Sequence, residues 1–238
     1  MRLLLFVLFL LSATLLHANG NIEYPTLANR AKNAKAFVPN GWKLIADTKG
    51  DLNKDGADDL VFIIESEKEY SSDLDEGRMY SPRIVGIAIW LPLENIFELK
   101  VQANDFIPTT EGNPAITDDP LESILIKGGT ARFYFHYMDN SKMYITDQTF
   151  IFYYNEDQFQ LAGYVRSKLH RSTQAYTREF LNYVSGTATL QKRSNDGEIG
   201  ADSDAKFEEK QKITFSNIGK AKNFKPQELK YNEFVGAY

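Results

Sequence analysis

The stretch Lys127-Gly-Gly-Thr-Ala-Arg-Phe-Tyr-Phe-His-Tyr137 decides the fold class of this chain. Within it, Phe133, Phe135 and Tyr137 recur at every second position. Successive side chains of a β-strand point to opposite faces, so this spacing predicts a strand with one aromatic face. The Gly-Gly pair in front of it is typical of a tight hairpin turn between antiparallel strands. The stretch therefore predicts antiparallel β structure.

Similar short apolar runs, separated by Gly, Asn, Asp and Pro clusters, continue over most of the chain after Gly41. The run Leu60-Val-Phe-Ile-Ile64 is continuously apolar, which is typical of a central strand buried on both faces. Connections as short as Asn155–Gln158 join antiparallel neighbours, and the sequence shows no β-α-β rhythm. We expect strands at Trp42–Asp47, Leu60–Glu65, Arg83–Leu91, Phe97–Ala103, Leu121–Ile126, Ala131–Tyr137, Gln148–Tyr154, Phe159–Lys168, Thr187–Lys192 and Lys206–Phe215. The segment Ser172–Tyr183 is compatible with a strand or a short helix, and we favour a strand.

Together these strands and turns predict an all-β fold with little helix, built as an antiparallel meander. A curled sheet, a sandwich and a propeller-like fragment all remain compatible with this pattern. The 238 residues suit one domain of roughly 200 residues. We divide the chain into a signal peptide at 1–18, a loosely packed polar leader at 19–41 and a single β-rich domain at 42–238. One helical turn is expected in the leader, around Leu27–Ala36.

The first 18 residues have the three parts of an export signal. Arg2 supplies a positive charge, Leu3–Leu11 is an unbroken apolar run, and Ala18 is a small residue suited to cleavage. The run is too short to span a bilayer, which takes roughly 20 residues. Cleavage after Ala18 leaves 220 residues with a net charge of −6. We predict a periplasmic or extracellular protein without a membrane span after cleavage, the alternatives being an uncleaved anchor and a buried helix.

Composition excludes several classes of function. The chain has no Cys, which rules out a disulfide scaffold, a thiolate metal site, a cysteine nucleophile and a lipid-anchor cysteine. A net charge of −5 argues against nucleic acid as a partner, because general binding to phosphates requires a basic face. A hydrophobic content of 43% is too high for a disordered chain.

The sharpest motif is the loop Gly50-Asp-Leu-Asn-Lys-Asp-Gly-Ala-Asp-Asp59. Side-chain oxygens occupy its first, third, fifth and ninth positions after Gly50, and Gly56 permits a sharp turn. Ca²⁺ takes about six to eight oxygen ligands in irregular geometry, whereas Mg²⁺ demands an octahedron. We predict a structural Ca²⁺ site, the alternative being a metal-free turn, because Asx residues and Gly also favour turns. The predicted metal ligands are Asp51, Asn53, Asp55, the carbonyl of Ala57, and Asp59.

The residues around this loop resemble a known group of proteins. Phe37-Val-Pro-Asn-Gly-Trp-Lys-Leu-Ile-Ala46, followed by the loop, looks like the opening of exported bacterial proteins of unassigned function. The loop itself is similar to the calcium loops of FG-GAP and VCBS-type repeats in integrin-like propellers. Phe62 stands where an EF-hand has its bidentate Glu, so the loop is not an EF-hand. The resemblance implies export, β structure and a metal loop, and it implies no reaction.

Candidate catalytic groups are few, and we predict no catalytic residue. His136 and His170 are the two His that remain after signal cleavage, and neither has metalloprotease spacing. The sequence has no Gly-x-Ser-x-Gly elbow, so a triad would require His136 with a remote Ser and Asp. The acidic group of Asp118, Asp119 and Glu122 is interpreted as a solvated turn.

Two groups of side chains are candidates for binding. The aromatic residues between Phe133 and Tyr164 either fill a core or present a face to a sugar, a peptide or a protein. A basic cluster downstream either receives an anionic group or protects a solvated strand edge; it comprises Arg166, Lys168, Arg171 and Arg178. We therefore expect a non-enzymatic exported domain that binds an unknown protein or glycan partner. The alternatives are a hydrolase acting on the cell envelope or on carbohydrate, and an immunity-type inhibitor of a toxin.

Overall fold

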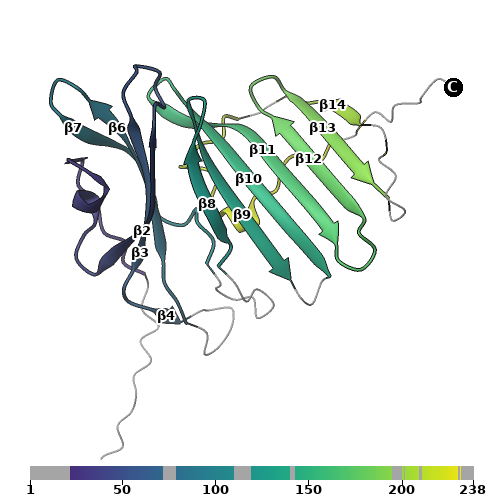
Figure 1. Ribbon diagram of the computed structural model, residues 1–238, viewed down its shortest axis with the longest axis horizontal. Helices are drawn as coiled ribbons and strands as arrows, with labels where there is room; N and C mark the ends of the chain where they lie inside the picture. The colour runs from purple at the N-terminus through teal and green to yellow at the C-terminus, as the bar shows by residue number, and fades with distance from the viewer. Residues whose placement is uncertain are drawn as a thin grey trace, which may run out of the picture.

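The computed structural model describes residues 22–71, 79–109, 119–139, 143–194, 200, 202–208, 211–229 and 231. Nearly all of its regular structure is antiparallel β, in two sheets and a small two-stranded ribbon (Figure 1). The helical segments in these ranges are two short 3₁₀ turns, η1 (Ala34–Phe37) and η2 (Ala221–Asn223). The predicted all-β fold is therefore confirmed. The predicted signal peptide at 1–18 lies outside the described residues.

The first sheet has five strands in the order β1-β7-β6-β3-β2. These are β1 (Arg30–Ala31), β2 (Trp42–Gly50), β3 (Asp59–Ser66), β6 (Arg83–Leu91) and β7 (Ile96–Ala103). On β3, Val61 and Ile63 face one hydrophobic core while Phe62 and Ile64 face another. The predicted two-sided burial of this strand is confirmed. The small ribbon consists of β4 (Tyr70–Ser71) and β5 (Met79–Tyr80).

The second sheet has seven strands in the order β14-β13-β12-β11-β10-β9-β8, so each strand pairs with its neighbour in the chain. They are β8 (Leu121–Ile126), β9 (Thr130–Asp139), β10 (Tyr144–Asn155), β11 (Gln158–His170), β12 (Tyr176–Asn182), β13 (Thr187–Arg193) and β14 (Ser203–Lys206). Phe133, Phe150 and Tyr164 lie opposite one another on three successive strands and are fully buried. We call the face that carries them the inner face and the opposite one the outer face.

The two sheets meet along β2 and β8 and share the core between them (Figure 1). Gly50 is required at this junction, because an added Cβ would lie 2.7 Å from Cγ2 of Ile126. Phe106, in the connection between the sheets, packs edge-on against Phe133 and Phe150 with ring centroids 5.2 and 5.3 Å apart. The arrangement is a curled, two-sheet fold whose aromatic residues mostly fill a core.

Two chain segments outside the large sheets complete the packing. The C-terminal segment, described at 211–229 and at Tyr231, lies against the inner face, where Phe215 stacks on Phe152 with centroids 4.1 Å apart. Residues 22–41, the described part of the polar leader, pack on the other side of the five-stranded sheet. There Phe37 is buried and stacks on Phe62. The leader is therefore packed tightly rather than loosely, because its few apolar side chains cover one face of β3.

The predicted strand boundaries need two corrections. The predicted strand Lys206–Phe215 is wrong: β14 ends at Lys206, and Phe215 turns into the core instead of continuing a strand. The predicted strand Ser172–Tyr183 begins later, at Tyr176, since residues 171–173 form the turn after β11. The strands β1, β4 and β5 were not predicted, because each has only two residues and cannot show an alternating pattern.

Candidate functional site

The loop between β2 and β3 is closed by its own side chains. Asp51 accepts hydrogen bonds from the backbone N–H groups of Lys54 at 2.6 Å and Gly56 at 3.0 Å. Asn53 Oδ1 accepts one from Asp55 N at 3.1 Å, and Asp55 Oδ1 accepts one from Ala57 N at 2.8 Å. Asx side chains that bond to nearby backbone N–H groups stabilise tight turns. Three of the predicted ligands thus line one compact loop.

The fourth predicted side-chain ligand, Asp59, anchors the loop to the sheet. It is completely buried at the start of β3. Its Oδ2 accepts hydrogen bonds from Leu52 N at 2.8 Å and Asn53 N at 3.3 Å, and its Oδ1 accepts one from Trp90 N of β6 at 2.9 Å. Burial raises the pKa of Asp59 above its usual value, and the nearby charge of Asp55 adds to this increase.

The oxygen-rich set Asp51, Asn53, Asp55, Ala57 and Asp59 has the chemistry that Ca²⁺ prefers. Within the described ranges, however, no three carboxylate or imidazole side chains lie close enough together to hold one ion. Each oxygen of an ionised carboxylate has two lone pairs, so Asp59 Oδ1 can accept from Trp90 and still bind a cation. The Ca²⁺ site stays a prediction.

His136, Asp147 and Ser167 meet on the outer face of the seven-stranded sheet. Asp147 lies opposite His136 on one side and Ser167 on the other. His136 Nδ1 is 2.7 Å from Asp147 Oδ1, and Ser167 Oγ donates to Asp147 Oδ2 at 3.0 Å. A serine nucleophile must contact the His that removes its proton, whereas here the Asp separates the two. The geometry fits a hydrogen-bonded structural His.

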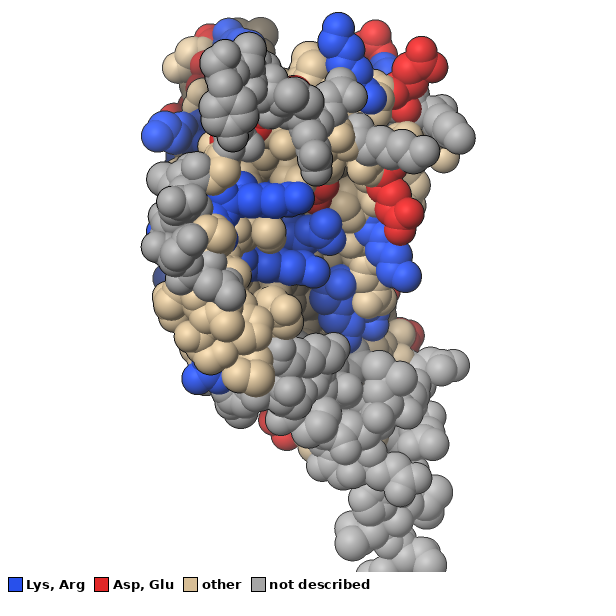
Figure 2. All heavy atoms as spheres, turned by 90° about the vertical axis from the view of Figure 1, so that its right-hand side faces the viewer, with Lys and Arg blue, Asp and Glu red and all other residues tan. Residues whose placement is uncertain are grey.

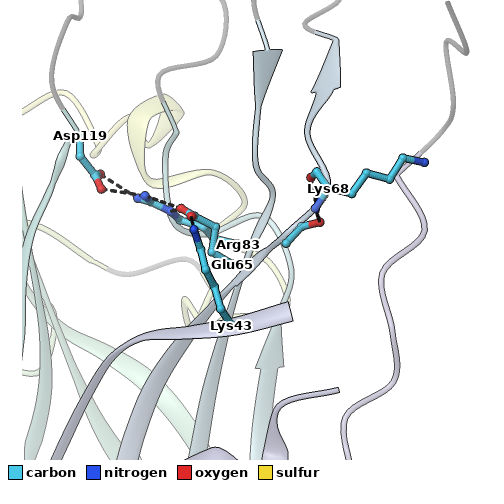
Figure 3. A network of polar contacts seen from close by, with 6 residues as sticks. Lys43, Glu65, Lys68, Arg83 and Asp119 are labelled. Atoms are coloured by element: carbon cyan, nitrogen blue, oxygen red, sulfur yellow. Dashed lines mark hydrogen bonds and ion pairs between the residues drawn. The ribbon is translucent and has the colours of Figure 1, made fainter. Parts of the chain in front are cut away.

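The acidic group before β8 takes part in an ion-pair network between the sheets (Figure 3). Arg83, at the start of β6, donates two hydrogen bonds of 2.7 Å to Asp119 and one of 2.8 Å to Glu65. Lys43 pairs with the same Glu65 at 2.9 Å. Although burial opposes it, the bonds from Arg83 hold the pKa of Asp119 below its usual value. Asp119 is therefore a structural partner of Arg83; Asp118 lies outside the described residues.

The four residues of the predicted basic cluster do not lie together in the structure. Arg166 and Lys168 lie on the inner face by strand register, while Arg178 lies opposite Ser167 on the outer face. Arg171 belongs to the turn that follows β11. Register also adds a residue that the sequence reasoning missed: Lys192 follows Lys168 across the sheet, with Thr177 between them. The charged end of the inner face is thus assembled from three strands.

Next to these charges, three polar atoms are buried without a hydrogen-bond partner among the described residues. They are the hydroxyls of Tyr137 and Tyr164 and the Oε1 of Gln148. Tyr164 is fully buried and Gln148 is 9% exposed. Burial raises the pKa of both tyrosine hydroxyls. The nearby Tyr164 adds to the increase at Tyr137, and at Tyr164 the charge of Glu179 adds to it while that of Arg166 opposes it. Buried polar groups are nearly always paired, so these three neighbouring exceptions set this part of the inner face apart from the rest of the described structure.

Arg166 connects these unpaired groups to the surface. It lies opposite Gln148 on one side and opposite Glu179 on the other, and its Nη2 donates to Glu179 Oε2 at 2.9 Å. The hydroxyl of Tyr231, from the C-terminal segment, donates to the second oxygen of Glu179. The side chain of Arg166 remains 33% exposed. We refer to Tyr137, Gln148, Tyr164, Arg166 and Glu179 as the inner-face cluster.

Comparisons with family models, with curated proteins and with solved structures give no match. None of the described segments forms a helix with the length and apolar character that crossing a membrane requires. The inner-face cluster was missed by the sequence reasoning because its members come from four strands and share no local spacing. One local signal was present, since Gln148 and Arg166 interrupt aromatic strands at inward-facing positions.

Proposed function

We propose that the chain is an exported, non-enzymatic binding domain and that the inner-face cluster is its ligand site. The observation that carries this proposal is the group of three buried, unpaired polar atoms on Tyr137, Gln148 and Tyr164. Leaving a buried polar group unpaired costs roughly 1–3 kcal/mol, which a ligand that supplies the missing partners offsets. Export rests on the N-terminal sequence at 1–18 alone.

In this proposal, Ca²⁺ in the loop 51–59 has a structural role. The loop leads directly from β2 into β3, and Gly129 of the β8–β9 turn lies against it, so that an added Cβ would be 3.0 Å from Lys54 Cε. A cation there would stabilise the junction of the two sheets. It would also offset the mutual repulsion of Asp55 and Asp59, which raises the pKa of Asp59.

The chemistry of the inner-face cluster favours binding over hydrolysis. Arg166 and Tyr231 occupy both oxygens of Glu179. The tyrosine hydroxyls are buried, and a raised pKa keeps them protonated at neutral pH, so they act as hydrogen-bond donors and acceptors rather than as bases. These side chains can hold and orient a polar molecule.

The test is native mass spectrometry of the full chain purified from its own host. Wild type should carry a non-covalent adduct of small-molecule mass that the Tyr137→Phe/Tyr164→Phe double variant lacks. The matched control is Tyr153→Phe, which removes a hydroxyl that donates to Gln160 at 3.2 Å and lies outside the cluster. The control should keep the adduct. A ligand-free wild type, or an adduct that the double variant retains, would contradict the proposal.

A further inference from the structure

From the charges and hydrogen-bonding groups on the inner face, we infer that the ligand is an acidic sugar, with a carboxylate or phosphate group beside free hydroxyls. This inference rests on the proposed binding function and specifies the class of ligand. The charged part would be held by Lys168, Lys192 and Arg166, and the hydroxyls by the remaining members of the inner-face cluster.

The cationic part of the site is a row of side chains across the sheet. Tyr137, Thr146, Lys168, Thr177 and Lys192 follow one another on five successive strands from β9 to β13. Neighbouring strands are about 4.8 Å apart, so the two lysines, two strands apart, can bind one anionic group between them. Figure 2 views the molecule from the side of β12–β14 and shows Lys and Arg side chains gathered in the middle of that face.

These lysines lack an acidic partner in the described part of the chain. Lys168 and Lys192 are exposed, and neither side chain has a hydrogen bond or ion pair to a described residue. Arg166 differs, because Glu179 already pairs with it. The row therefore carries two positive charges that no described acidic side chain pairs with, on a protein whose net charge is −5. Such a local excess attracts an anion.

The polar atoms beside this row match hydroxyl groups rather than a bare anion. The tyrosine hydroxyls both donate and accept, whereas the unpaired Oε1 of Gln148 accepts only. An anion without hydroxyls has no proton to give to Gln148, and a neutral sugar leaves the lysines unpaired. A molecule with both an anionic group and hydroxyls satisfies both halves of the site.

The ligand reaches the buried hydroxyls by displacing part of the C-terminal segment. The ring of Phe224 packs on Tyr164 with centroids 5.0 Å apart, and Tyr231 is bonded to Glu179. Arg166, one-third exposed, marks the place where the cluster meets solvent. Binding should therefore alter the surroundings of Phe224 and Tyr231 as well as those of the cluster.

The test is an NMR titration of the full chain with four probes: D-glucuronate, glucose 6-phosphate, D-glucose and sulfate, an anion that carries no hydroxyl at neutral pH. One of the two acidic sugars should bind at least 10-fold more tightly than both D-glucose and sulfate, with shifts at Tyr137, Gln148 and Tyr231. Comparison of glucuronate with glucose 6-phosphate identifies the anionic group. The Lys168→Gln/Lys192→Gln variant should weaken this binding at least 10-fold. The control Lys206→Gln, on the outer face by register, should not.

Two outcomes would overturn the inference. Equal affinity for D-glucose and the acidic sugars would show that the lysines do not contribute to binding, and tighter binding of sulfate than of the acidic sugars would show that the sugar hydroxyls do not contribute. The proposed binding function is tested separately by the mass-spectrometry experiment. It fails if the protein purified from its own host carries no adduct, whatever the NMR titration shows. An adduct whose mass identifies a neutral molecule would preserve the function and refute the acidic sugar.

Discussion

The loop 51–59 and the inner-face cluster are both rich in polar groups, and they satisfy those groups in opposite ways. In the loop, the side chains of Asp51, Asn53 and Asp55 find backbone partners within five residues. In the cluster, groups brought together from separate strands leave the hydroxyl of Tyr164 and the Oε1 of Gln148 without a partner among the described residues. The loop thus pairs its polar groups locally, whereas in the proposed binding site the unpaired groups remain available to a ligand.

The largest effect is expected at the anchor of the loop. Asp59→Ala removes the acceptor for three backbone N–H groups, those of Leu52, Asn53 and Trp90. The free energy of unfolding should fall by about 3–5 kcal/mol, because buried donors lose a charged acceptor. Urea denaturation measures this. The control Asp58→Ala, at an exposed position, should stay within about 0.5 kcal/mol of wild type. A loss below about 1 kcal/mol for Asp59→Ala would show that the anchor is dispensable.

Calcium should produce the next largest effect. A metal that binds the folded state alone stabilises it by about 2.7 kcal/mol at 100 times its Kd. We expect the melting temperature to rise with Ca²⁺ and to fall again with EDTA, and Asp55→Ala to abolish this response. Asp58→Ala should retain it. If EDTA leaves the melting temperature unchanged and Asp55→Ala melts like wild type in Ca²⁺, the metal prediction is wrong.

In the inner-face cluster, removing a polar group should increase stability. Tyr164→Phe deletes a buried hydroxyl that has no partner in the described residues, so the free energy of unfolding should rise by about 1 kcal/mol. Tyr153→Phe deletes a hydroxyl that donates to Gln160 and should lower it by about 0.5–1.5 kcal/mol. The same urea experiment compares the two variants. Loss of stability in Tyr164→Phe would mean that its hydroxyl is paired in solution.

The smallest effect should come from the lysine row. Lys168→Gln relieves repulsion from Lys192 in the ligand-free protein, so the melting temperature should rise by about 1 °C at low ionic strength. Added salt at about 1 M should abolish the difference, because it shortens the screening length to about 3 Å. Lys206→Gln serves as the control and should show no salt-dependent increase. A decrease at low salt would indicate that Lys168 has an acidic partner.

The features that could be predicted from the sequence, the strands and the loop motif, depend on residues that are close together in the chain. Alternation in Phe133–Tyr137 and the apolar run at Leu60–Ile64 identified the strands, because side-chain periodicity is a local property. The loop motif was likewise visible, since its partners lie within a few residues. The cluster was not, because the proximity of Gln148 to Arg166 and of Lys168 to Lys192 depends on strand register.

Errors in the sequence reasoning have the same origin. The leader 19–41 looked polar because four of its apolar residues are scattered, yet Leu27, Ala31, Ala34 and Phe37 are all buried on the sheet. The apolar residues Ile213 and Phe215 alternate as in a strand. In the structure, Phe215 packs into the core between the sheets, where it stacks on Phe152. Tertiary packing overrode local pattern in both places.

The position of the C-terminal segment has a consequence for the order in which the protein folds. Ile213 bonds to Leu161 N, Ala221 N bonds to the carbonyl of Phe106, and Phe224 packs on Phe150. This segment follows all the described strands in the chain and completes the core between the two sheets. Contacts between distant parts of a chain form slowly. Because the core requires residues that follow all its strands in the chain, it can close only after those strands have been made.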